Sequence, residues 1–310
     1  MMKEPSRRVS LALFVASLLL TMCPRVEAQT KQTTSTKTLA LGVVFQGLRQ
    51  PLEEHFRPLV DYAAGKLSPT GETKGIVVVA PTVGQMMKLL EEKRVDFYME
   101  SPYPTYLINR LGAAKLLLRR WKGGIGEYRS LLFTHKESGV VRMEDLRGKI
   151  IAFEDQGSTS GYFLPKLFLL KKGFSVVEKS GVGAKVSARE IGYIFAETDK
   201  NMVNLVLQNK VAAGAFSNDD YASVNEANKA ALSILGESDS VPRHLVSVRK
   251  DLPEPVVKRL KEVLLSMDQN EEGQKILRQT DATTKFDPLP GGEEAVRRKL
   301  VELYRPRRGK

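Results

Sequence analysis

The pentapeptide Gly157-Ser158-Thr159-Ser160-Gly161 stands between an apolar run at 149–153 and a segment at 162–170 with apolar residues three and four apart. The run predicts a buried strand and the spacing predicts a helix. The first amides of a helix lack partners within it, and the helix dipole makes that end positive. Glycines admit a ligand close to the backbone and three hydroxyls add donors, so the turn predicts a cradle for a small tetrahedral anion such as phosphate. The alternative is an ordinary Ser/Thr helix cap with turn glycines.

Strands and helices alternate along the chain. Apolar runs at 39–44, 75–80 and 94–99 predict strands, and segments with helical spacing lie between them at 51–67 and 82–92. This alternation predicts an α/β protein with a mainly parallel sheet. Further strands are predicted at 129–134, 149–153, 211–216 and 242–248, and further helices at 201–209, 254–268, 271–279 and 291–304.

The order of these elements predicts two lobes joined by two crossing strands, near 130 and 242. Lobe one is expected to comprise 38–129 plus 244–310, and lobe two 135–238. In such an architecture a ligand binds between the lobes, at the carboxyl ends of the strands.

The first residues of the chain have the features of a secretory signal peptide, expected to span 1–28. Basic residues, among them Arg7 and Arg8, precede an apolar run at 11–22 that is too short to span a bilayer. Residues 29–37 are polar and predict a flexible tether. A second interpretation is a lipoprotein, because 20–23 resembles a lipoprotein box in which Cys23 would be lipidated.

Charge and composition narrow the classes of function. Cys23 is the only cysteine, which excludes an intrachain disulfide and a cysteine-rich metal site. The net charge of +12 creates a field that attracts anions. No aromatic-basic repeat or zinc pattern points to nucleic acid. His55, His135 and His244 show no metal spacing, so neither a metal nor another cofactor is expected.

Four segments together resemble the periplasmic substrate-binding proteins of phosphate, phosphite and phosphonate ABC transporters. The resemblance covers roughly 38–280, and its most specific element is the Ser-Thr-Ser-Gly-Tyr sequence after a Leu-x-Gly-Lys strand. The segments are Val95-Asp96-Phe97-Tyr98-Met99-Glu100-Ser101-Pro102-Tyr103-Pro104, Glu127-Tyr128-Arg129-Ser130, Asp145 to Lys149 leading into Gly157 to Tyr162, and Gly214 to Tyr221.

The resemblance implies a two-lobed periplasmic-binding-protein fold, type II-like, with a mixed sheet and flanking helices in each lobe. It also implies a monomeric, hinge-closing periplasmic binder that captures a phosphorus oxyanion and delivers it to an ABC permease in the inner membrane. A ligand-sensing module for a membrane signalling partner is the alternative. No enzyme activity and no catalytic residue is expected, since the pentapeptide centres on Thr rather than Ser and therefore fails as a nucleophile elbow.

The ligand contacts are carried over from the resemblance one by one. Ser158, Thr159 and Ser160, flanked by Gly157 and Gly161, are expected to hold the oxyanion. Tyr128 is expected to donate its hydroxyl at the lobe crossing, and Asp219 to meet a ligand amine. From the residues themselves, Ser101 and Tyr103 are expected to line the cleft from lobe one, because a Ser-Pro turn after a strand points there.

Two departures from the family pattern bear on the ligand. Many phosphonate binders have a tyrosine after the second strand, where this chain has Pro81-Thr82-Val83-Gly84. They also have a Gly-Ser-His-type segment in lobe two, where this chain has Glu197-Thr198-Asp199-Lys200. The chain therefore lacks a histidine donor and a tyrosine donor that its relatives use.

Overall fold

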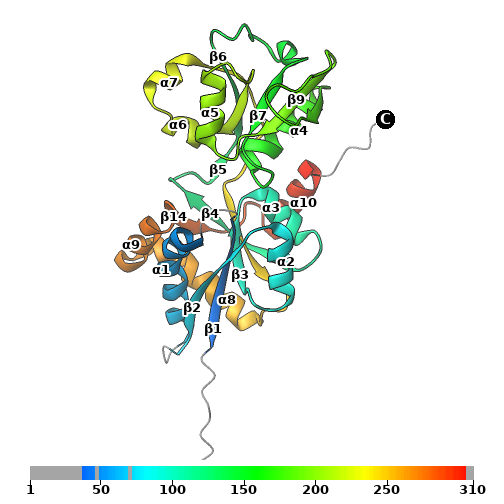
Figure 1. The fold of residues 1–310 in the computed structure, drawn as a ribbon. Coiled ribbons are helices and arrows are strands. Elements are labelled where there is room, and N and C mark those ends of the chain that lie inside the picture. The colour runs from blue at the N-terminus through cyan, green and yellow to red at the C-terminus, as the bar shows by residue number, and fades with distance from the viewer. Residues whose placement is uncertain (1–36, 46–48, 69–71, 305–310) are drawn as a thin grey trace, which may run out of the picture. The chain divides into compact units, whose positions relative to one another are not determined.

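The computed structural model describes residues 37–45, 49–68 and 72–304 (Figure 1). The predicted signal peptide, Cys23 and all of the predicted tether except its last residue lie outside the described residues.

The first sheet has six strands in the order β14-β4-β13-β3-β1-β2. The strands β1, β2 and β3 run parallel, with Leu41 of β1 beside Val77 and Phe97. The strand β13 pairs antiparallel with both β3 and β4, and β14 pairs antiparallel with β4. The bounds are β1 (Thr38–Val44), β2 (Lys74–Ala80), β3 (Phe97–Glu100), β4 (Ala114–Lys122), β13 (His244–Arg249) and β14 (Thr283–Asp287).

The second sheet also has six strands, in the order β11-β6-β10-β7-β9-β8. The strands β10, β7, β9 and β8 are parallel, whereas β6 is antiparallel to its neighbours β10 and β11. The bounds are β6 (Ser130–His135), β7 (Ile150–Phe153), β8 (Ser175–Glu178), β9 (Glu190–Phe195), β10 (Gly214–Ser217) and β11 (Leu232–Glu237).

A short antiparallel pair connects the two sheets. It consists of β5 (Glu127–Tyr128) and β12 (Val241–Pro242), with Val241 opposite Tyr128. The chain passes from the first sheet to the second through β5 and returns through β12 (Figure 1). These two-residue strands precede β6 and β13, the long strands that enter the second and the first sheet.

The fold expected from the resemblance, with a mixed sheet and flanking helices in each lobe, is confirmed, and most of the strand pairs in the second sheet are parallel. Parallel strands end at the boundary between the sheets, but β6 and β13 begin there and run away from it. The register of the strands shows this reversal. Ser217, the last residue of β10, lies opposite Ser130 of β6. Glu100, the last residue of β3, lies opposite Leu245 of β13. Each sheet therefore presents the carboxyl ends of its parallel strands to the boundary.

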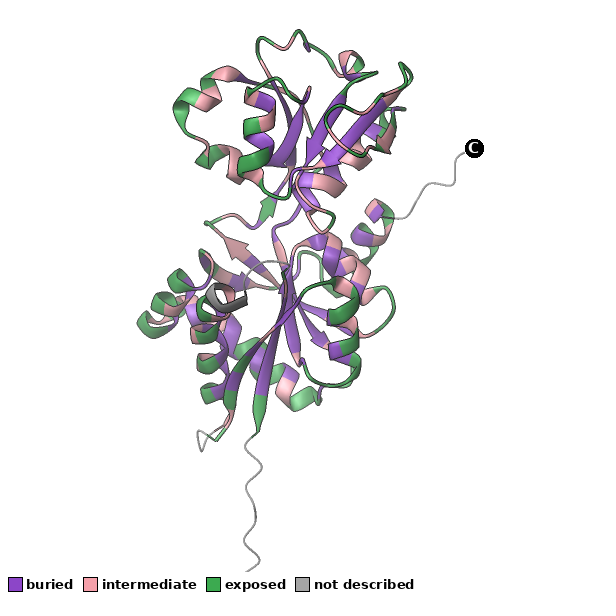
Figure 2. Cartoon of the chain, in the orientation of Figure 1, coloured by how far each residue is buried: buried purple, intermediate pink, exposed green. Residues whose placement is uncertain are grey.

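Helices cover both faces of each sheet, so the central strands are mostly buried, whereas the edge strands β2, β8, β11 and β14 are partly exposed (Figure 2). In the first lobe α1, α8 and α9 enclose one core and α2 and α3 the other. In the second lobe α5 packs on one face and α4 on the other. The helices are α1 (Arg49–Leu67), α2 (Val83–Glu91), α3 (Pro102–Asn109), α4 (Leu164–Lys171), α5 (Asp199–Leu207), α6 (Asn218–Ser223), α7 (Glu226–Ala231), α8 (Glu254–Ser266), α9 (Glu271–Gln279) and α10 (Glu293–Tyr304).

Candidate functional site

The predicted cradle is the turn between β7 and a short π-helical segment, Thr159–Phe163, that continues into α4. Ser158 is the N-cap, and its hydroxyl accepts the amide N–H of Gly161 at 2.9 Å. A Cβ atom on Gly161 would lie 2.5 Å from a carboxylate oxygen of Glu154, so only glycine fits there. The turn thus places the first amides of a helix at the carboxyl end of a parallel strand, where the Ser158 hydroxyl already satisfies the Gly161 amide.

Thr159 connects the cradle to the first lobe. Its hydroxyl donates to the Ser101 hydroxyl at 2.8 Å and accepts the amide N–H of Tyr103 at 2.9 Å. Ser101 is the N-cap residue of α3, with Pro102 in the first turn. The N-termini of α3 and of the π-helical segment therefore face each other, with the Thr159 hydroxyl between them.

The Ser-Pro turn expected after the strand is the start of the helix α3, with Ser101 as its N-cap and Pro102 as its first residue. Serine at the N-cap followed by proline at the first helical position is a recognised helix start, since proline lacks an N–H that would have no partner there. The helical start strengthens the anion chemistry of this segment. It adds the positive end of a second dipole to the one at the cradle.

Tyr128 lies at the boundary and is only 2% exposed. Burial raises its pKa to about 12, opposed by the Arg243 guanidinium and by the Thr159 side chain. The Arg243 guanidinium lies over the Tyr128 ring, 4.4 Å from its centroid, and its Nε donates to Asp219 Oδ2 at 3.0 Å. Tyr128 is therefore a protonated donor held between a cation and the cradle.

A cluster of carboxylates surrounds the cradle on the side of the second lobe. Burial, together with the charges of Asp155 and Asp220, raises the pKa of Glu154 to about 7. Burial and the nearby Glu154 carboxylate raise the pKa of Asp199 to about 8. This acidic cluster consists of Glu154, Asp155, Asp199, Asp219 and Asp220, which follow the strands β7, β9 and β10.

The structure brings four of the predicted ligand residues together: Ser101, Tyr103, Thr159 and Tyr128. Ser160 is 8% exposed, and its carbonyl accepts the Ser130 hydroxyl at 2.6 Å.

The remaining predicted residues already have local partners. Ser158 caps the π-helical segment, and the Gly157 amide donates to Asp155 Oδ1 at 2.6 Å. One oxygen of Asp219 is paired with Arg243, while the other, Oδ1, is buried with no hydrogen-bond partner among the described residues. Asp219 is thus oriented by a cation of this chain and retains one carboxylate oxygen for a ligand.

Sequence reasoning did not single out Glu154, Asp155, Asp199, Asp220 or Arg243 as site residues. A usable signal existed for three of them, because Glu154 and Asp155 directly follow the strand before the cradle and Asp199 stands where the family has a histidine. Arg243 carried no such signal.

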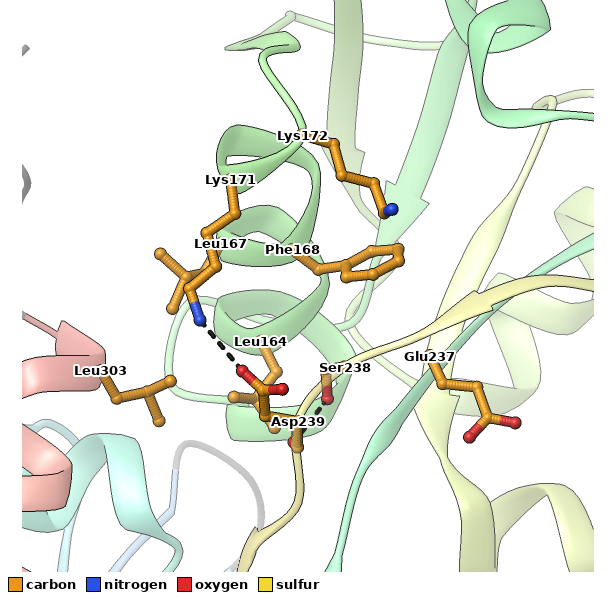
Figure 3. Close-up of a pocket in the computed structure, with 9 residues that line it drawn as sticks. All are labelled: Leu164, Leu167, Phe168, Lys171, Lys172, Glu237, Ser238, Asp239 and Leu303. Carbon is orange, nitrogen blue, oxygen red and sulfur yellow. Dashed lines mark hydrogen bonds and ion pairs between the residues drawn. The ribbon is translucent and has the colours of Figure 1, made fainter.

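Two pockets stand out in the described part of the chain, and no residue of the cradle pentapeptide lines either of them. One, of about 380 Å³, is lined by Asp199, Asp220 and Phe216 with residues of α5, α6 and α7. The other, of about 230 Å³, lies against α4 (Figure 3). It is lined by Leu164, Leu167, Phe168, Lys171, Lys172, Glu237, Ser238, Asp239 and Leu303, and Lys171 is paired with Asp239 at 3.0 Å.

The described residues do not indicate metal binding, because no group of three or more His, Cys, Asp or Glu side chains among them is arranged to hold an ion. His244 is half-buried, and desolvation beside Arg243 and Arg120 lowers its pKa well below the ordinary value, so it is neutral at neutral pH. None of the described helices is long and apolar enough to cross a lipid bilayer.

The fold and this boundary site define a two-lobed solute-binding protein. A family model described as the periplasmic substrate-binding protein of phosphonate ABC transporters matches residues 41–290, and the chain belongs to that family. The family is one of periplasmic transport proteins that take a small ligand and have a permease as partner.

Solved structures share the fold over most of the chain. XAC2383 from Xanthomonas citri, bound to chloride ion, is 29% identical, with a TM-score of 0.79 over 86% of this chain and 95% of that one. The same protein bound to ATP gives a TM-score of 0.78 with the same identity and coverage. PhnD1 from Prochlorococcus marinus, in complex with methylphosphonate, is 17% identical, with a TM-score of 0.63 over 87% of this chain and 98% of that one.

Proposed function

We propose that the protein captures a phosphorus oxyanion at the boundary between its lobes and delivers it to an ABC permease. One observation carries the proposal: the Thr159 hydroxyl accepts the N-terminal amide of Tyr103 from the other lobe at 2.9 Å. A hydroxyl oxygen thus occupies a place between two helix N-termini, where the oxygen of an anion is favoured. Membership of the phosphonate-binding family supports the same ligand class.

The acidic cluster refines the ligand class. The ionised carboxylates beside the cradle repel a ligand that carries only negative charge and attract an ammonium group, whereas the raised pKa values of Glu154 and Asp199 leave those two partly protonated at neutral pH. We therefore propose a ligand that joins a phosphonate or phosphate group to an amine. Monoprotonated phosphate and phosphite are the next candidates, because a protonated oxygen can donate to a carboxylate. ATP, the ligand of the Xanthomonas citri protein in one of its structures, carries several negative charges and is expected to bind weakly here.

A thermal-shift panel tests this proposal. We expect aminoethylphosphonate to raise the melting temperature most, followed by methylphosphonate, phosphite and phosphate, with little effect from sulfate, sulfonates or ATP. A ligand at about 100 times its dissociation constant adds about 2.7 kcal/mol to the free energy of unfolding. A shift with sulfonates alone would contradict the phosphorus assignment, and a shift with ATP alone would contradict the role of the carboxylates.

The second candidate function is a sensory module that reports the same ligand to a membrane signalling partner. It requires the same site, so the panel does not separate the two. Reconstitution with a cognate permease and ATPase does: ligand-dependent ATP hydrolysis supports transport, and its absence with a ligand-loaded protein supports the sensor.

Binding of an anion is expected to strengthen as the pH falls. The Glu154 carboxyl, whose pKa is about 7, faces the cradle, and its protonation removes a charge that repels the ligand. If only the protonated form binds, affinity rises about tenfold from pH 8 to pH 6 by proton linkage. Calorimetric titration with methylphosphonate across this range measures the slope.

The Glu154→Gln variant distinguishes protonation of Glu154 from protonation of the ligand and of other side chains. Glutamine resembles the protonated acid, so the variant should bind at pH 8 about as tightly as the wild type does at pH 6. An unchanged slope in Glu154→Gln would assign the pH dependence to Asp199, or to Glu100, whose pKa burial also raises to about 7. The raised pKa means that the folded state binds more protons than the unfolded state. The contribution of Glu154 to the free energy of unfolding therefore decreases as the pH rises from about 4.5 to about 7.

A further inference from the structure

The last turn of the C-terminal helix α10 reaches the second lobe. Leu303 packs with Leu164 of α4, and Figure 3 shows both side chains at the same end of the pocket. The ring of the next residue, Tyr304, lies edge-on to Phe163 with centroids 4.4 Å apart. The helix α10 otherwise packs on the first lobe through Val296 and Leu300. Two consecutive residues of α10 thus contact the segment that follows the cradle.

The ring of Tyr304 is fixed by aromatic contacts and by the apolar cluster that it shares with Val296 and Leu300. Besides Phe163, it contacts Tyr106 at 4.9 Å and Tyr103 at 5.5 Å between centroids. These contacts come from α3 and from the end of the π-helical segment. The hydroxyl group takes part in none of them, so phenylalanine would satisfy the same packing.

The Tyr304 hydroxyl is nevertheless directed to the place where the two helix N-termini meet. The side chain is 6% exposed, and its oxygen is buried with no hydrogen-bond partner of normal geometry among the described residues. Its polar neighbours are Tyr128, Tyr103 and Thr159, and an interaction with the Thr159 side chain partly opposes the rise of its pKa. The Thr159 hydroxyl already donates to Ser101 and accepts from the Tyr103 amide. A buried hydroxyl without a well-formed hydrogen bond destabilises the fold, so its position needs another explanation.

We propose that the Tyr304 hydroxyl donates a hydrogen bond to the bound phosphorus oxyanion, which makes the C-terminal helix part of the ligand site. This inference rests on the proposed function and adds a donor that the sequence did not suggest. The oxyanion would then be held by groups of both lobes: the N-terminus of α3, the cradle, Tyr128 and Tyr304. Burial and the neighbouring tyrosines raise the pKa of Tyr304 well above its ordinary value, so the group remains a donor at neutral pH.

The test compares Tyr304→Phe with Tyr106→Phe in the full chain. Both variants remove one hydroxyl from the same aromatic group and keep the rings. Calorimetric titration uses methylphosphonate, aminoethylphosphonate and inorganic phosphate, and thermal melts are recorded without ligand. We expect Tyr304→Phe to bind the probes at least about tenfold more weakly, as expected for a lost hydrogen bond to a charged group. Its ligand-free melting temperature should equal or exceed that of the wild type, and Tyr106→Phe should match the wild type in both measurements.

Two results would overturn the inference while leaving the proposed function intact. One is Tyr304→Phe binding within twofold of a wild type that binds the probes. The other is a lower ligand-free melting temperature of Tyr304→Phe than of Tyr106→Phe, which would mean that the hydroxyl has a structural partner. A wild type that binds none of the three probes would instead remove the proposed function and this inference with it.

Discussion

Replacing Arg120 with alanine should lower the free energy of unfolding by about 3 kcal/mol, because it removes the charge-assisted hydrogen bonds of a buried guanidinium, although its partner Asp281 is itself 35% exposed. Arg120 is 1% exposed on β4, the second strand of the first sheet. Its guanidinium donates to the Thr283 hydroxyl at 2.7 Å and to a carboxylate oxygen of Asp281 at 2.9 Å. Chemical denaturation of the ligand-free protein measures the change.

The contacts of Arg120 hold a strained turn. Asp281 and Ala282 have φ angles of 44° and 52°, a left-handed conformation that residues other than glycine rarely adopt. The Asp281 carbonyl also accepts from Arg120, at 2.8 Å. Burial alone would raise the pKa of Asp281, but the charges of Arg120 and Lys122 hold it below its ordinary value. Alanine at 120 would leave this carboxylate with Lys122 alone and release the turn before β14.

The matched control is Arg297→Ala. Arg297 also pairs with a carboxylate, that of Glu294 at 2.7 Å, but its side chain is 58% exposed. Exposed pairs contribute about 0–1 kcal/mol, so this variant should change the free energy of unfolding little. Equal losses in the two variants would show that burial of Arg120 adds nothing to its ion pair.

The structure also shows which parts of the fold the sequence could reveal. The strands β1 and β7 are buried on both faces, so their continuous apolar runs were sufficient for prediction. The helix α9 was predicted with its observed bounds, Glu271–Gln279, because an Asn cap and acidic first turn mark its start. These signals depend only on neighbouring residues, so they can be recognised in the sequence without knowledge of the tertiary structure.

The strand β4 was missed for the opposite reason. It ends in Arg119-Arg120-Trp121-Lys122, and such a charged run is ordinarily solvent-exposed. Arg120 can be buried only because Asp281 and Thr283 lie beside it, and those partners are more than 160 residues further along the chain. No property of the sequence around 120 contains that information.

The candidate site also has one part that the sequence could predict and one part that it could not. The cradle is a contiguous pentapeptide after a predictable strand, so sequence alone identified it. The acidic cluster is assembled from three βα turns, and each of its members has a local explanation as a cap or turn residue. Asp220, for example, forms a capping box with Ser217 at the start of α6. The electrostatic effect that raises the pKa of Glu154 and Asp199 arises only when the sheet brings these turns together.

Replacing Ser158, Thr159 and Ser160 together with alanine should weaken anion binding by at least about 1,000-fold. A hydrogen bond to a charged group contributes about 1.5–3 kcal/mol, and three such losses exceed the roughly 4 kcal/mol that corresponds to this factor. Thr159 is expected to matter most, since its hydroxyl also connects the cradle to Ser101 and to the Tyr103 amide in the other lobe. Calorimetric titration with aminoethylphosphonate and methylphosphonate measures the loss.

A control is needed because the triple variant also removes a helix cap. Ser158 accepts the Gly161 amide, and loss of such a cap lowers stability by about 0.5–2 kcal/mol. Asn270→Ala removes the cap of α9, whose side chain accepts the Gly273 amide at 2.8 Å, and Asn270 is not among the site residues. We therefore expect the two variants to lose comparable stability while only the triple variant loses binding. If the triple variant binds within tenfold of the wild type, the hydroxyls serve the helix alone and the anion must be held elsewhere.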